Sequence, residues 1–168
     1  RPRPPIWIGA FAPKAMERAL NYEGWCTWFP PHVDELGPAV KTMRERAAER
    51  GKKDFKITFG FEGWLSDEPD IREKHGHRWV KEWSFYADKG LSPDVQGKTM
   101  LDSIESMFLC LGNKQKWIDR MGEMKEKVNP DQICIRTRNP VNSGQYYPSR
   151  TESLEQVERF GEILNDIR

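Results

Sequence analysis

Short apolar runs alternate with longer amphipathic segments along this chain. Runs rich in Ile, Trp, Phe and Thr predict β-strands over residues 6–10, 24–29, 56–61 and 132–138. In the last two runs the apolar residues recur at every second position, at Ile57, Phe59, Phe61, Ile133 and Ile135. Because strand side chains alternate between faces, this spacing predicts that these five point toward covering helices and that the residues between them point inward.

A helix is predicted after each strand. Pro13 suits a first helical position, and Asp34 and Asn113 are predicted helix caps. The predicted helices cover residues 13–20, 34–50, 113–128 and 151–167. Residues 66–108 break this rhythm, because they are too many for a simple loop and include helical sequence with Trp79 and Trp83 four residues apart.

The β–α alternation predicts an α/β fold of parallel βαβ units with right-handed crossovers. An open doubly wound sheet and a (β/α)8 barrel share this rhythm. A full barrel takes about 250 residues, so four units would form half of one. The pattern alone does not decide between the two architectures.

Composition narrows the choice of partners. The 27 basic residues nearly balance the 26 acidic ones, which leaves a net charge of +1, and we expect neither a nucleic-acid nor an anionic-membrane partner. No apolar run approaches the roughly 20 residues that span a bilayer. The first residue is Arg1 rather than Met, and we interpret the chain as a fragment of a longer product.

The three cysteines, Cys26, Cys110 and Cys134, are far apart and form no C-x-x-C pair. This pattern favours small buried thiols in a reducing, cytoplasmic compartment.

Five segments carry a resemblance to a known family. They are a proline-rich segment before a strand (Pro2–Ala15), Tyr22-Glu23-Gly24-Trp25, the helix end Ala47–Asp54, Gly112-Asn113-Lys114-Gln115, and the strand Asp131–Arg136. In this order and at this spacing they resemble the carboxy-terminal part of the luciferase-like monooxygenases.

The resemblance implies the carboxy-terminal half, strands five to eight, of a (β/α)8 TIM barrel. Residues 1–168 would then form a single partial-barrel domain, with residues 66–108 as an insertion, or lid, after the third strand of the chain. A half-barrel exposes two sheet edges, so the resemblance also implies either a homo-oligomer or a missing amino-terminal half.

The same resemblance implies a flavin cofactor, FMN or the deazaflavin F420. Its phosphate would meet the loop Gly9-Ala10-Phe11-Ala12, the helix that begins at Pro13, and Lys14. Backbone amides at a helix N-terminus and a nearby cation bind such a dianion well. The family prefers Gly, Ser or Thr in this loop, so Ala10 and Phe11 depart from its pattern, and a plain strand-to-helix turn is the alternative. Trp28 is a candidate contact of the flavin ring, with core packing as its alternative.

Inward positions near the strand ends give weaker catalytic candidates. Glu62 and Arg136 would orient a substrate or would pair with each other, since buried charges need a partner. His75 is a candidate for proton transfer, and solvated lid surface is the alternative. His75 and His77 are separated by one residue and have no third metal ligand nearby, so no metal is expected. Thr58 and Gly60 stand where sulfonate-oxidising relatives have Arg and His, which argues against a sulfonate substrate.

We therefore predict a flavin-dependent oxidoreductase or monooxygenase that acts on a small organic substrate, with this chain supplying part of the cofactor and substrate site. The isolated chain is expected to be inactive. One alternative is a non-catalytic half-barrel fragment or subunit that needs a partner chain, and a weaker one is an unrelated doubly wound domain that binds a phosphate compound.

Overall fold

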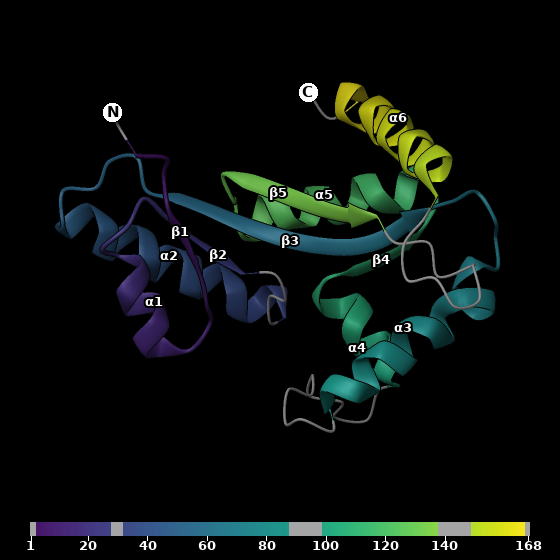
Figure 1. Ribbon diagram of the computed structural model, residues 1–168, viewed down its shortest axis with the longest axis horizontal. Helices are drawn as coiled ribbons and strands as arrows, with labels where there is room; N and C mark the ends of the chain where they lie inside the picture. The colour runs from purple at the N-terminus through teal and green to yellow at the C-terminus, as the bar shows by residue number, and fades with distance from the viewer. Residues whose placement is uncertain (1–2, 28–31, 88–98, 138–148, 167–168) are drawn as a thin grey trace. The chain divides into compact units, whose positions relative to one another are not determined.

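The computed structural model describes residues 3–27, 32–87, 99–137 and 149–166 of the chain. Figure 1 shows strands and helices alternating from the N-terminus, with β3 (Lys56–Leu65) as a long continuous strand. Two compact units divide the chain, and each is described by itself. Unit 1 comprises residues 1–61 and 123–134, and unit 2 comprises residues 62–122 and 135–168.

Unit 1 contains three strands in parallel. These are β1 (Trp7–Gly9), β2 (Gly24–Thr27) and the first part of β3. Trp7 pairs with Gly24, which in turn pairs with Lys56. The crossover helices are α1 (Pro13–Ala19) and α2 (Val33–Glu49). The α/β class and the parallel pairing predicted from the alternation are thereby confirmed.

One face of these strands carries the core of unit 1. Trp25, Ile57, Phe59 and Phe61 are buried in a cluster with residues of α2 and the end of α5 (Lys114–Lys127). This is the helix-facing side that the alternation predicted for the three residues of β3. The opposite side carries Cys26 and Thr58, which are paired across β2 and β3.

Unit 2 contains the second part of β3, β4 (Leu109–Gly112), and most of the insertion. Glu62 pairs in parallel with Leu109, and Leu65 pairs with Gly112. Its helices are α3 (Ile71–Ala87), α4 (Met100–Met107), the first part of α5, and α6 (Arg150–Asp166). The strand β5 (Gln132–Thr137), which continues from one unit into the other, pairs with β3.

Helices cover both faces of β4. Leu109 and Leu111 belong to a cluster with Trp79 and Trp83 of α3. The same cluster includes Ile104 of α4 and Phe108, which follows α4. Cys110, between them in the strand, belongs to a second cluster with Leu65, Trp117, Phe160 and Ile163. Alternate side chains of one strand thus enter different cores.

Close helix contacts hold the first of these clusters together. A Cβ placed on Gly76 of α3 would lie 2.4 Å from Leu101 Cδ2 of α4, so a larger residue at this crossing would require the Leu101 side chain to move. Trp79 and Trp83 lie on the packing side of the insertion, and the ring of Trp83 lies 4.8 Å from that of Phe108 at an interplanar angle of 50°.

Three local expectations need correction. Asp34 does not cap α2, because the helix already begins at Val33 and His32 holds the N-cap position. The third strand does not end at Phe61 but continues to Leu65. Strand β4 was not predicted at all, because its four residues are too few to show an alternation. Asn113 does cap α5, since its Oδ1 accepts a hydrogen bond from the amide of Lys116 at 3.1 Å.

Candidate functional site

The loop after β1 is anchored on one side by Trp25. The amide of Ala10 donates to the carbonyl of Cys26 at 3.1 Å, and the Trp25 indole N–H donates to the carbonyl of Ala10. The Phe11 ring lies 6.2 Å from the Trp25 ring and remains 37% exposed. Strand pairing and the indole therefore fix the start of the loop, while its later part faces solvent.

The N-terminus of α1 carries no side-chain cap. Ala12 is the N-cap residue, is extended (φ −64°, ψ 137°), and makes no side-chain cap. Its carbonyl accepts from Ala15 and Met16. Pro13 has no N–H to satisfy, and Lys14 is exposed and forms no ion pair with another described residue. An anion that approaches this end meets amide dipoles and a cation.

An ion pair fixes the segment that leads into β1. Two guanidinium nitrogens of Arg3 bond the Glu23 carboxylate at 2.9 and 2.6 Å, and the Ile6 amide donates to the same carboxylate at 2.8 Å. These hydrogen bonds, that of Arg3 first, lower the pKa of Glu23 to about 2. The strand thus starts from a defined position next to β2.

Thr58 carries a buried hydroxyl on the side of the unit 1 strands away from the helices. Its side chain is buried, and Oγ1 has no hydrogen-bond partner among the described residues. Cys26 is its neighbour across the strand pair, and burial raises the pKa of this thiol, with a smaller contribution from nearby Cys134. This side therefore holds neutral, weakly polar groups. A Cβ built on Gly9 would lie 3.6 Å from Cys26 Sγ, which is ordinary contact distance.

Glu62 and Arg136 form an ion pair within unit 2. Glu62 is completely buried in β3, and Arg136 of β5 retains 29% exposure of its side chain. Of the two interpretations of these inward charges, mutual pairing is therefore the one that the geometry realises. The guanidinium neutralises the buried carboxylate while part of it reaches solvent.

His75 lies on α3 and is mostly buried. Its Nε2 lies 3.7 Å from a Glu68 carboxylate oxygen, and its Nδ1 has no hydrogen-bond partner in the part of the chain that the structure describes. Burial, the largest cause, and the positive charge of Arg78 lower its pKa. The imidazole is thus only partly exposed, with 14% of its side chain accessible, so it is less solvated than a lid surface residue was expected to be.

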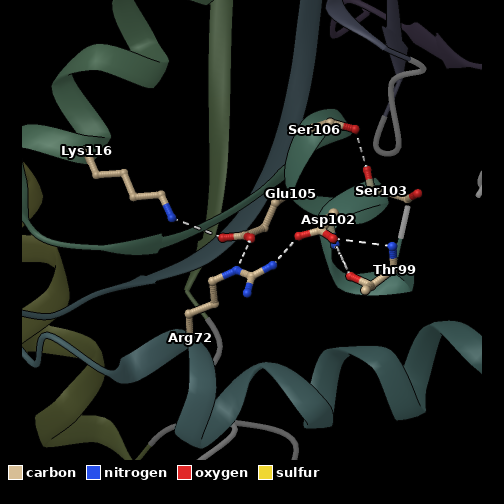
Figure 2. A network of polar contacts seen from close by, with 7 residues as sticks. All are labelled: Arg72, Thr99, Asp102, Ser103, Glu105, Ser106 and Lys116. Carbon is tan, nitrogen blue, oxygen red and sulfur yellow. Dashed lines mark hydrogen bonds and ion pairs between the residues drawn. The ribbon is translucent and has the colours of Figure 1, made fainter. Parts of the chain in front are cut away.

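A polar network joins the insertion helices to α5 (Figure 2). Arg72 Nε donates to Glu105 at 2.6 Å, and another guanidinium nitrogen bonds Asp102. Lys116 reaches the second oxygen of Glu105 at 3.0 Å, and Thr99 and Asp102 form a capping box at the start of α4. The sequence alone did not reveal this network, because Arg72 and its partners are about thirty residues apart.

A buried amide fixes the end of β3. Gln156 of α6 accepts from the Leu65 amide at 3.0 Å and donates to the Leu65 carbonyl at 2.9 Å. Arg159 donates to the same carbonyl at 3.0 Å and to Asp67. The available signal was a glutamine at a core-facing position, four residues before Phe160 and seven before Ile163.

The remaining predicted positions are accounted for as follows. Trp28, proposed to line a flavin ring, lies outside the described residues, as do Phe29 and Arg138. Within the described part of the chain no three His, Cys, Asp or Glu side chains gather as metal ligands. The helices described here are all too short or too polar to cross a membrane.

Comparison with solved structures identifies the fold. A long-chain alkane monooxygenase (LadA) matches 97% of this chain with a TM-score of 0.66 and 18% identity. An F420-dependent secondary alcohol dehydrogenase matches 99% with a TM-score of 0.65 and 16% identity. The EDTA monooxygenase of Chelativorans sp. BNC1 matches 97% with a TM-score of 0.69 and 12% identity. This chain has the same fold as these three oxidoreductases over nearly its whole length.

This chain matches only part of each of these solved structures. The chain spans 41%, 50% and 44% of the lengths of these three structures. In sequence, it is 24% identical over 139 residues to a mitochondrial homologue of "Sensitive to high expression protein 9" from Kluyveromyces lactis, covering 75% of this chain and 33% of that protein. No protein-family profile matches the sequence.

Proposed function

We propose that this chain forms part of a luciferase-like oxidoreductase in which the loop Gly9–Ala12 and Lys14 bind the phosphate of FMN or F420. The observation that carries the proposal is the likeness in fold, over nearly the whole chain, to two monooxygenases and an F420-dependent dehydrogenase. The substrate would be a small organic molecule, as alkane, EDTA and secondary alcohol are for those proteins.

The exposed end of α1 fits a phosphate. Ala12 leaves the first turn without a side-chain cap, Pro13 removes one N–H, and Lys14 adds a mobile cation beside the remaining amides. Phe11 brings no hydroxyl to the loop and its ring lies beside that of Trp25, so its backbone N–H is the group that it would offer a phosphate. Backbone amides rather than hydroxyl groups would therefore make most of the phosphate contacts.

The chemistry of the reaction belongs to the cofactor: FMN supports oxygen transfer and F420 supports hydride transfer. The contribution of this chain would be to hold the phosphate, and so to fix the ring, while Arg136, paired with the buried Glu62 but still 29% exposed, would be a weak candidate for a substrate contact. Trp28 stays a predicted ring contact, and His75 a weak candidate for proton transfer.

The share of the fold in this chain would be strands five to eight of a (β/α)8 barrel. Three solved enzymes with this fold are two to two and a half times longer than the part matched. Further polypeptide would then be needed to close the barrel and complete the active site. A non-catalytic half-barrel that needs a partner chain is the second candidate, favoured by the exposed apolar side chains Leu154, Val157 and Leu164 of α6. Free thiols at all three cysteines support a cytoplasmic location.

Titration of FMN and F420 fluorescence with the purified 168-residue chain tests the phosphate site. Quenching is expected, and Lys14→Glu is expected to weaken it by roughly tenfold, because the cation becomes an anion. Lys41→Glu is the matched control, since Lys41 is a 79% exposed lysine of α2 in the same unit. No quenching by the unmodified chain, or equal affinities of the two variants, would overturn the assignment of the loop.

A further inference from the structure

Two side-chain nitrogens of α3 are buried without a hydrogen-bond partner. They are Nδ1 of His75 and one terminal guanidinium nitrogen of Arg78, and neither meets an acceptor or donor in the ranges that the structure describes. The two residues are three positions apart, so their side chains are neighbours on the helix surface. Arg78 is also the charge with the largest effect on the pKa of His75, which it lowers. Buried polar groups are normally hydrogen-bonded, so this pair needs an explanation.

Arg78 differs from the other arginine of α3. Arg72, six residues earlier, forms ion pairs with the carboxylates of Asp102 and Glu105. Arg78 forms no hydrogen bond or ion pair with a described residue, although part of its guanidinium is buried. A buried cation is normally paired, because removing it from water costs free energy. The chain therefore supplies a cation at this position and no anion to neutralise it.

The surroundings of His75 determine which ring nitrogen carries the proton. Nε2 lies 3.7 Å from a Glu68 carboxylate oxygen, so the proton of the neutral imidazole belongs on Nε2 and Nδ1 holds a lone pair. Burial, the largest cause, and the charge of Arg78 lower the pKa of His75, so the neutral form predominates at pH 7. An imidazolium would keep Nε2–H toward Glu68 and would add a second N–H at Nδ1.

The other charges around the imidazole do not fill the gap. Lys74 and His77 of α3 lower the pKa of His75 further, and Glu68 raises it from the Nε2 side. Two elements pack on α3, namely α4 and β4. Both carboxylates of α4 are held by Arg72, and β4 has no charged residue. An anion at the two buried nitrogens would therefore have to come from outside the described residues.

We propose that His75 and Arg78 bind a small carboxylate, which takes up one proton as it binds. One carboxylate oxygen would accept from Nδ1–H of the imidazolium and the other from the guanidinium nitrogen. Two donors match the two oxygens of a planar carboxylate, whereas a phosphate would keep further oxygens without a donor. The His75 side chain is 14% exposed and Arg78 is half-buried, so the anion would enter from the surface. Because neither nitrogen is itself exposed, we expect anions of the size of formate or acetate.

Titration of the 168-residue chain with formate and with acetate at constant ionic strength tests the site. The measurement is the imidazole ¹⁵N resonance of His75, which should change from a lone-pair to an N–H type at Nδ1 on binding. Because only the imidazolium binds, the affinity should be at least about tenfold higher at pH 5.5 than at pH 7.5. Inorganic phosphate should bind at least about tenfold more weakly than formate.

Three variants separate binding from a structural role. Arg78→Met should abolish binding without lowering the Tm of the free chain, because it removes a buried donor that has no partner. Lys81→Met is the matched control, since it removes one charge from an exposed residue of the same helix and should leave the affinity unchanged. His75→Asn keeps an N–H donor near the position of Nδ1 but does not titrate, so the affinity should no longer depend on pH.

Several results would overturn the proposal. They are His75 resonances that do not respond to formate or acetate, phosphate binding as tight as that of formate, and an equal loss of affinity in Arg78→Met and Lys81→Met. A fall in the Tm of free Arg78→Met would show that the guanidinium already stabilises the fold through the chain itself. The titration contains no flavin, so a negative result for the loop Gly9–Ala12 leaves this test valid.

Discussion

The carboxylate of Glu62 is completely buried in β3 and forms its ion pair with Arg136 of β5. A buried charge that loses its partner costs far more than the intact pair contributes. We expect Arg136→Met, which strands the carboxylate, to destabilise the protein by about 3 kcal/mol, at the lower end of the range for buried pairs because Arg136 reaches solvent. Urea unfolding followed by circular dichroism measures the change.

Replacing both partners of this pair provides the control. Glu62→Leu/Arg136→Met removes the charge together with its neutraliser and should recover most of the loss. A double variant as unstable as Arg136→Met would show that packing, and not the stranded carboxylate, dominates at this position.

Gly63 is expected to tolerate no side chain. It has a φ of +157°, and a Cβ there would lie 1.9 Å from the carbonyl oxygen of Cys110. Gly63→Ala should lower the free energy of unfolding by about 3 kcal/mol, because the backbone of β4 must move. The contrasting variant is Gly122→Ala in α5, where the added Cβ meets nothing within 4 Å and should stabilise the helix by about 0.5–1 kcal/mol. Thermal unfolding of both variants checks the pair, and equal effects would contradict the predicted contact.

Cys110 is expected to resist alkylation as long as the protein is folded. Burial, the largest cause, raises the pKa of its thiol to about 12, so very little thiolate is present near neutral pH. Iodoacetamide at pH 7.5 followed by peptide mass spectrometry should label Cys26 before Cys110, since Cys26 is only partly buried. In guanidinium the two should react alike, and comparable labelling rates in the native protein would rule out a sealed environment for Cys110.

The ion pair between Arg3 and Glu23, which we call the Arg3–Glu23 clamp, is expected to open in acid. The pKa of the Glu23 carboxyl, about 2 in the fold, lies below its ordinary value of 4.5. The ionised carboxylate therefore stabilises the clamp above pH 4.5, and this contribution is lost as the pH falls toward 2. The protection factor of the Ile6 amide, which compares its exchange rate with that of an unstructured peptide at the same pH, should fall over this range, and Glu23→Gln should lower it already at pH 6. Glu49→Gln, at an exposed residue of α2, serves as the control. An exchange rate that is the same in Glu23→Gln and in the unmodified chain at pH 6 would remove the carboxylate from the clamp.

The β–α order was predictable because local sequence determines it. The alternation of Ile57, Phe59 and Phe61 predicted both a strand and its buried side. Pro13 and Asn113 predicted where two helices begin. Strand β4 was missed because Leu109–Gly112 has only four residues and follows directly on α4. A run this short shows no alternation in its sequence, so only the elements that pack around it reveal that it is buried.

The site was less predictable because its contacts join distant positions. Glu62 and Arg136 were recognised as inward charges, but only the pairing of their strands shows that each satisfies the other. The contact between Gln156 and Leu65 spans 91 residues and could not be inferred from either segment alone. The loop Gly9–Lys14 stays a predicted phosphate site, resting on resemblance and on the open end of α1.

The two hydrogen bonds between Gln156 and Leu65 have a consequence for how the sheet can grow. The side-chain amide offers one acceptor and one donor, as the peptide group of an adjoining strand would. With its N–H and C=O both occupied, Leu65 has nothing left to offer an incoming extended segment. A single helical glutamine thus terminates the ladder at this point and protects it from misdirected strand addition during assembly with other polypeptides.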